Sequence, residues 1–203
     1  MLVAPTQKEE EKNWKSKKGK MKQRKTMLQP ARHTFMFPDL EFVVLRPPRH
    51  FVEHDIVSVF PEAPKNPSTY YCIVTFQPSL YESLIPFSDG AQDFKDVSRE
   101  RFLRLMDAIQ QKFLAPCQDK ERWMDWVDPA TGLAFHSAAG SCCIYSETDA
   151  IEQLLFLDVV HVAGSGGGCR CVVHPKYGLD VYPATAFLAG SSPEDVLSIL
   201  NSM

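Results

Sequence analysis

The segment Gly164–His174 holds the residues best suited to chemistry, because two cysteines and a histidine directly follow a glycine-rich loop. The loop, residues 164–168, has almost no side chains, so a bulky partner can approach its backbone closely. From Cys169 the sequence alternates as in a strand, which places Cys169 and Cys171 on one face and His174 on the other. The segment therefore predicts thiols presented to a large partner. The alternative is an ordinary hairpin loop that leads into a half-buried strand with two structural cysteines.

Zinc is one chemistry that this segment could support, since Cys169, Cys171 and His174 are all zinc-ligand types. The spacing differs from the C-x2–4-C of zinc turns, and strand alternation turns His174 away from the thiols. Three further residues could complete a ligand set: Cys142, Cys143 and His161. A zinc-stabilised binding module remains an alternative on this basis.

Nucleophilic catalysis by a cysteine would need a nearby base, and His136, His161 and His174 are all candidates between which the spacing does not select. The glycine run precedes a predicted strand rather than a helix, and no G-x-x-x-x-G-K-[ST] motif is present, so a phosphate-binding loop is not predicted. Asp125 and Asp128 could form a catalytic or metal-binding carboxylate pair. Turn preferences instead favour Asp128 as a turn residue beside an exposed Asp125.

The elements that must position the loop follow from the periodicity of the chain. Residues 41–45 and 70–76 are predicted strands, and 55–60 is a short element between them. A connection is expected over 81–96. Ser98 is then expected to cap a helix that ends near Pro116, with its apolar positions at helical spacing.

The second half of the chain alternates turns and short elements. Residues 123–135 are predicted to form a hairpin around the turn 128–132, and 142–145 a strand. Thr148 is expected to cap a short helix that leads to the glycine loop. A second hairpin is expected around 175–178, and a last helix from Ser192-Pro193. These elements together predict an α+β domain.

Charge and composition divide the chain into two parts. Residues 1–33 contain 10 Lys/Arg and 3 Glu, a charge of +7, and lack an apolar period, which predicts a disordered basic tail. Residues 34–203 hold the remaining 12 basic and 22 acidic residues, a charge of −10, and are predicted to form one domain. A solvated tail is favoured over one that binds nucleic acid or anionic lipid or directs nuclear import, and neither a nucleic-acid partner nor a membrane is expected.

The expected compartment is reducing. No signal peptide opens the chain, so the six cysteines are expected as thiols rather than three disulfides. The tail is Lys-rich and contains three glutamates, which is unlike a mitochondrial leader. The cytosol is therefore the expected location, and the mitochondrion stays open as a second one.

Several motifs resemble the cobalamin trafficking protein CblD family, the methylmalonic aciduria and homocystinuria type D proteins. The most specific is WxDxxDPxxGLAF from Trp123 to Phe135. It is followed in the family's order by Glu147-Thr148-Asp149, by Gly168-Cys169 and by His174-x-x-x-Gly178. Residues 55–63 resemble the start of the family's folded domain. The similarity spans roughly residue 40 to the end of the chain, without the tail.

The resemblance implies a single α+β domain, with an antiparallel sheet and packed helices, similar to the flavin-dependent nitroreductase fold but without bound flavin. It implies a non-enzymatic adaptor that works with the processing protein CblC. Such an adaptor helps to route cobalamin to methionine synthase in the cytosol and to methylmalonyl-CoA mutase in mitochondria. It also implies a cysteine after glycine as a thiolate ligand to cobalt.

Carried over to this sequence, the cobalt ligand is Cys169, preceded by Gly168. Thiolate is a soft ligand suited to such a metal, and glycines allow a corrin ring to approach. The family has two adjacent cysteines here, whereas this chain has Cys169-Arg170-Cys171, so Cys171 is the second candidate for the ligand. A flavin-dependent reductase that kept both fold and cofactor is the enzymatic alternative.

Overall fold

A five-stranded antiparallel sheet, in the order β1-β2-β3-β7-β4, forms the centre of the molecule. The structure, a computed structural model, describes residues 32–65, 70–79, 84, 89–115, 122–137, 143–164 and 167–203. The strands of this sheet are β1 (Arg32–His33), β2 (Glu41–Leu45), β3 (Tyr71–Pro78), β4 (Trp123–Trp126) and β7 (Val181–Ala189). The predicted strands at 41–45 and 70–76 are confirmed as β2 and β3, and the α+β class is confirmed with them.

Every residue of β2 and β3 is buried, because helices cover both faces of the sheet. One face packs against α4 (Asp89–Leu114) and α6 (Pro193–Asn201). The other face packs against the helical run of α2 (Arg49–Phe51), η2 (Val52–Ile56) and α3 (Val57–Val59), and against α5 (Glu147–Leu155). A strand covered on both sides favours apolar residues at successive positions, which explains the largely apolar sequence of both strands; the buried polar exceptions are Glu41, Thr75 and Gln77.

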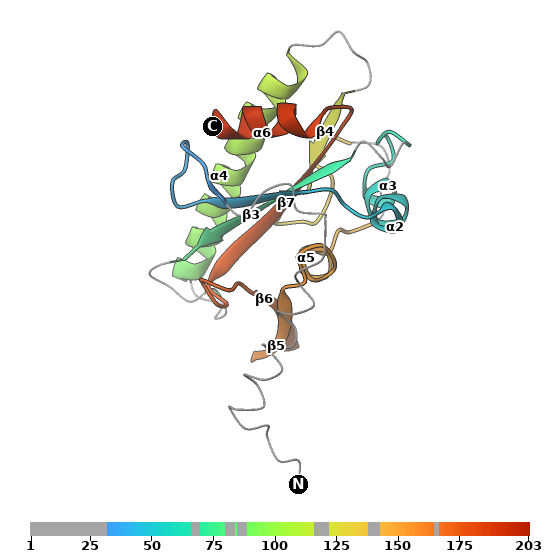
Figure 1. The fold of residues 1–203 in the computed structure, drawn as a ribbon. Helices are drawn as coiled ribbons and strands as arrows, with labels where there is room; N and C mark the ends of the chain where they lie inside the picture. The colour runs from blue at the N-terminus through green and yellow to red at the C-terminus, as the bar shows by residue number, and fades with distance from the viewer. Residues whose placement is uncertain are drawn as a thin grey trace, which may run out of the picture.

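A separate two-stranded hairpin carries the glycine-rich segment. Its strands are β5 (Asp158–Gly164) and β6 (Gly167–Val173), paired from Asp158↔Val173 to Gly164↔Gly167. The hairpin lies beyond α5, at the opposite end of the molecule from α6 (Figure 1). Its position explains why it shares little of the main core.

Two helix starts differ from the sequence prediction. Helix α4 begins at Asp89, so Ser98 is not its cap but a buried residue inside it, whose carbonyl accepts a hydrogen bond from Gln77 Nε2 at 2.7 Å. The connection expected over 81–96 is therefore wrong from residue 89 onward, and residues 81–83 and 85–88 lie outside the described part. Helix α5 is capped by Ser146, two residues before the predicted Thr148.

Three strand predictions are also corrected. Residues 143–145 form no strand, while Cys142 lies outside the described residues. The second half of the 123–135 hairpin is reduced to a single bridge, Val127↔Ala134, because β4 pairs with β7 instead. The turn after His174 closes with one bridge to Gly178, and the chain then crosses to the main sheet as β7.

The domain boundary shifts by two residues. Strand β1 falls inside the segment assigned to the basic tail, yet it pairs with β2 through Arg32↔Phe42 and His33↔Glu41. The sheet therefore begins two residues before the predicted boundary at 34. The rest of the expected tail, residues 1–31, lies outside the described part of the chain. The last helix begins as predicted, with Ser192 accepting from Asp195 N at 3.2 Å and Pro193 in the first turn.

Candidate functional site

Strand β6 brings Cys169 and Cys171 to the same face of the hairpin. Opposite them on β5 are Val162, paired with Cys169, and Val160, paired with Cys171. Cys169 is exposed, whereas Cys171 is partly buried, and both are free thiols. The Cys169 Sγ lies 3.8 Å from the carbonyl oxygen of Arg170. The more accessible thiol is therefore Cys169, at the glycine end of the strand.

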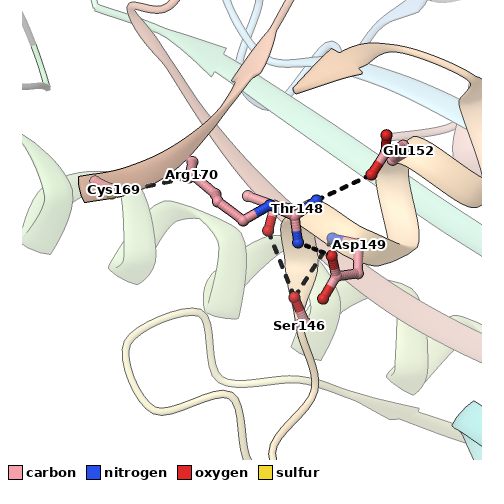
Figure 2. Close-up of polar contacts among 6 residues, drawn as sticks. All are labelled: Ser146, Thr148, Asp149, Glu152, Cys169 and Arg170. Carbon is pink, nitrogen blue, oxygen red and sulfur yellow. Dashed lines mark hydrogen bonds and ion pairs between the residues drawn. The ribbon is translucent and has the colours of Figure 1, made fainter. Parts of the chain in front are cut away.

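The opposite face of β6 is fixed to the body of the protein. Arg170 donates to a carboxylate oxygen of Asp149 and, at 2.9 Å, to Glu152 Oε2, both on α5 (Figure 2). Val172, on the same face, is buried in the core between the sheet and α5. Because neighbouring residues on a strand point to opposite faces, these contacts turn the thiol face away from α5.

The thiols differ in their electrostatic surroundings. Burial raises the pKa of Cys171, and the neighbouring Cys169 thiol raises it further, while the charge of Lys95 acts in the opposite direction. The guanidinium of Arg170 is directed to two carboxylates on the far side of the strand, and those carboxylates in turn raise its own pKa. The cation next to Cys169 in sequence therefore serves to hold the strand.

Helix α5 owes its position to the turn that precedes it. The Ser146 hydroxyl accepts from Asp149 N at 3.4 Å and caps the helix, and the Tyr145 backbone N–H donates to Gly132 O at 2.8 Å. Gly132 has a φ of +71°, and a Cβ added there would lie 2.6 Å from Ile144 Cγ2. Glycine at this position thus lets the 143–146 segment pass directly over the turn.

The turn itself is organised by the two motif aspartates, which do not form a pair. Asp128 accepts from Arg99 Nε at 2.6 Å and from Ala130 N at 3.1 Å, which confirms its predicted role in the turn. The Arg99 guanidinium holds the pKa of Asp128 below its usual range. The expectation that Asp125 is exposed is wrong, since only 1% of it is accessible.

Asp125 fixes the segment that follows the turn. Its carboxylate accepts four hydrogen bonds, from Trp126 N, His136 N, Ser137 N and the Ser137 hydroxyl, at 2.7 to 3.1 Å. Donors in this number allow a carboxylate to be buried without a counter-charge. A Trp-x-Asp sequence alone gives no sign of this role, because three of the four donors come from eleven and twelve residues further along the chain.

None of the candidate histidines lies with the thiols. His174 is 6% exposed, stacks on Tyr177 with ring centroids 4.8 Å apart, and has its Nε2 3.5 Å from Glu41 Oε1. Burial lowers the pKa of His174, and the nearby Glu41 opposes that shift. His136 packs edge-on against Trp126 at 4.5 Å, and His161 pairs with Arg170, so it lies on the other face of the hairpin from the thiols.

The positions of the histidines determine which of the candidate metal and acid–base sites are formed by the described residues. Across the described ranges, no group of three or more His, Cys, Asp or Glu side chains is arranged to hold a metal ion. Neither the three-ligand set Cys169, Cys171 and His174 nor a Cys–His catalytic pair is therefore assembled here. Cys142, the remaining candidate ligand, is outside the described residues.

Glu147 belongs to the Glu147-Thr148-Asp149 motif and was not a predicted site residue, yet its carboxyl group lies in a buried environment. Thr185 donates its hydroxyl to one carboxyl oxygen, and the other oxygen has no hydrogen-bond partner within the described part of the chain. Burial raises the pKa of Glu147 to about 7, with the Thr185 hydrogen bond acting against it. Glu147 is the first residue of α5, the helix that holds Arg170.

A pocket of about 340 Å³ opens beside the first turns of α5. Its wall includes Asp55, Ser58, Ile144, Ser146, Asp149 and Glu152. Burial raises the pKa of Asp55, and the charge of Asp149 adds to the shift. The pocket is lined by carboxylates on the side of α5 that also contacts Arg170.

No protein-family model matches this chain, and no curated protein is similar enough in sequence to count as a match. In the described part of the chain, no helix is both long enough and apolar enough to cross a membrane.

Proposed function

We propose that this protein is a non-enzymatic adaptor for cobalamin delivery, in which Cys169 supplies a thiolate to the cobalt of a cobalamin held by a partner of the CblC type. The observation that carries the proposal is the exposed thiol of Cys169 on a strand whose other face is fixed to α5. A soft ligand at the glycine end of a hairpin suits a cobalt centre that arrives within a second protein.

The surroundings of the thiol also support this role. On the thiol face, Cys169 is opposite Val162 and Cys171 is opposite Val160, so this part of the hairpin is small and apolar. Gly167 and Gly168 add no side chains beside the thiol, and a flat macrocycle can approach such a surface closely. Cobalamin is cargo shared with the partner here, so no catalytic residue is assigned to this chain.

The residues of the motifs that carry the family resemblance act together to position the strand that bears the thiol. Asp125 and Gly132 shape the turn over which residues 143–146 pass, and that segment caps α5. Asp149 on α5 then receives Arg170 from β6. Residues that are far apart in the sequence thus share one task, which is to orient the strand that carries Cys169.

The proposal extends to the fold, the partners and the place of action. An antiparallel sheet with packed helices supports a relation to the flavin-dependent nitroreductase fold, without bound flavin. Methionine synthase, in the cytosol, is the proposed destination of the cobalamin, and methylmalonyl-CoA mutase in mitochondria is a second one.

The test is the absorption spectrum of cob(II)alamin mixed with the CblC partner and this protein. Wild type and Cys171→Ser are expected to change the cobalt absorption, whereas Cys169→Ser leaves the spectrum of the partner complex as it was. Cys143→Ser is the matched control, because Cys143 is also exposed but lies outside the hairpin. If Cys169→Ser changes the cobalt absorption in the same way as wild type, Cys169 does not supply the thiolate.

A further inference from the structure

The hairpin carries a second thiol that the adaptor role does not use. Cys171 is two residues beyond Cys169 on β6, and the two thiols lie on the same face of the strand. We infer that Cys169 and Cys171 together form a two-thiolate site for a soft cation of low coordination number, and that Cu(I) is the ion it takes.

Strand geometry favours a bridging ion over a disulfide. Residues i and i+2 of a strand have Cα atoms about 6.6 Å apart. This separation is at the upper end of the roughly 4.4 to 6.8 Å found in disulfides, so a direct bond would strain β6. A metal ion at about 2.3 Å from each sulfur spans about 4.6 Å, which the two side chains can reach by rotating about χ1.

The lack of further donors selects the ion. Structural zinc takes four ligands, and the described residues offer no third His, Cys, Asp or Glu to these thiols. His174 is committed to Glu41 in the core, and His161 lies on the opposite face of the hairpin. Thiolates prefer soft ions, and Cu(I) is satisfied by two of them, whereas Zn²⁺ is not.

Charge and protons balance as follows. Two thiols bind one Cu⁺, two S–H bonds are replaced by two S–Cu bonds, and two protons leave, so the site carries a net charge of −1. No electron is transferred in this step. Because each thiol must lose its proton to bind the ion, affinity rises with pH. The adjacent Val160 and Val162 limit hydration of the bound ion.

The experiment is an anaerobic titration with Cu(I) alone against a chromophoric Cu(I) chelator, in the full chain and without any partner protein. Wild type is expected to take one Cu(I) at this site and to release two protons per ion. Cys169→Ser and Cys171→Ser are each expected to weaken binding by at least about 100-fold. Loss of a residue that only hydrogen-bonds to a metal ligand costs about 10- to 100-fold in affinity, and loss of the ligand itself should cost more.

Two controls make the result decisive. Cys143→Ser removes an exposed thiol elsewhere and should keep wild-type affinity. The four cysteines outside the hairpin are unchanged in the double variant Cys169→Ser/Cys171→Ser, so any copper that it still binds belongs to them. Wild-type affinity in either single variant, or in the double variant, would overturn the site. Equal affinity for Zn²⁺ at the same two thiols would overturn the choice of ion.

The experiments can refute the copper site without refuting the adaptor role, and the reverse. Cys171→Ser should lose copper binding but keep the cobalt response, whereas Cys169→Ser should lose both. Loss of copper binding with neither variant affecting the cobalt spectrum would leave the two-thiolate site and remove the adaptor role. A cobalt response that depends on Cys169, together with no copper binding by wild type, would do the reverse.

Discussion

The guanidinium of Arg170 on β6 donates to the carboxylate of Asp149 in the first turn of α5. This contact, shown in Figure 2, joins the hairpin to the body of the protein. Strand alternation places it on the side opposite the thiols. Glu152, one turn further along α5, receives the other end of the guanidinium at 2.9 Å. The orientation of Cys169 therefore depends on a residue that does not touch the thiol face.

Replacing Arg170 should loosen the hairpin with little effect on global stability. Arg170→Met keeps an apolar stem and removes the donors to both carboxylates. The free energy of unfolding is expected to change little, because solvent screens this exposed ion pair. Amide hydrogen exchange over residues 167–173 should become faster, while that of β2 and β3 stays unchanged.

The matched control is Arg49→Met, which removes the exposed ion pair between Arg49 and Glu53, in a helical segment remote from the hairpin in sequence. It should leave exchange in β5 and β6 as in wild type. If hydrogen exchange in the hairpin becomes faster by the same factor in both variants, or does not change in Arg170→Met, the ion pairs of Arg170 do not hold β6.

Glu147 should make stability depend on pH. Its pKa is raised by burial to about 7, against an ordinary value of 4.5, so the folded protein binds this proton more tightly than the unfolded chain. The free energy of unfolding should therefore fall as pH rises from about 4.5 to about 7, by roughly 3 kcal/mol from this group alone, and then level off.

The Glu147 contribution is measured as the difference between wild type and Glu147→Gln in urea unfolding at pH 5 and pH 8.5. The lowered pKa of His174 gives a slope of opposite sign below about pH 6.5, and it cancels in this difference. Glu147→Gln should gain stability relative to wild type at pH 8.5. Glu152→Gln, an exposed carboxylate on the same helix, should not, and a similar gain there would refute the assignment.

The two motif aspartates should differ in their contribution to stability. Asp125→Asn removes an acceptor from four donors in a buried place and should cost about 2 to 4 kcal/mol of unfolding free energy. Asp128→Asn loses a partly exposed ion pair with Arg99 and should cost about 1 kcal/mol or less. Urea unfolding of both variants gives the comparison, and a larger loss in Asp128→Asn would contradict it.

Gly132 and Gly178 form a matched pair for the role of the turn. Both have positive φ, so alanine at either should cost about 1 to 2 kcal/mol from backbone strain. At Gly132 the added Cβ also meets Ile144 Cγ2 at 2.6 Å and Tyr145 O at 2.9 Å, which should add about 1 to 3 kcal/mol. At Gly178 nothing lies within 4 Å. Equal losses of thermal stability would contradict the tight packing at Gly132.

The sequence predicts well those parts of the fold that local patterns determine. Strands β2 and β3, the turn at Asp128 and the Ser192 cap of α6 all follow from composition and spacing over a few residues. The start of α4 does not, because Asp89 to Val97 lack a clear apolar period and the buried Ser98 resembles a cap. Sheet pairing also decides outcomes that no local pattern shows, as when β4 pairs with β7 and leaves its expected partner strand unformed.

In the candidate site too, the features determined by local sequence could be predicted, and those determined by packing could not. Alternation along β6 predicts that Cys169 and Cys171 share a face and that His174 does not lie with them. The partners of Arg170 could not be predicted, because they come from a helix about twenty residues earlier and depend on how the hairpin lies beyond α5. The burial of the Glu147 carboxyl group could not be predicted for the same reason, since it depends on packing against Thr185 of β7.

The most direct test of the central claim is cobalt K-edge X-ray absorption of cob(II)alamin bound to the CblC partner and this protein. The account predicts a sulfur atom in the first coordination shell of cobalt with wild type and with Cys171→Ser, and its disappearance with Cys169→Ser. A cobalt shell without sulfur in the wild-type complex, or one that keeps its sulfur when Cys169 is replaced, would contradict the account.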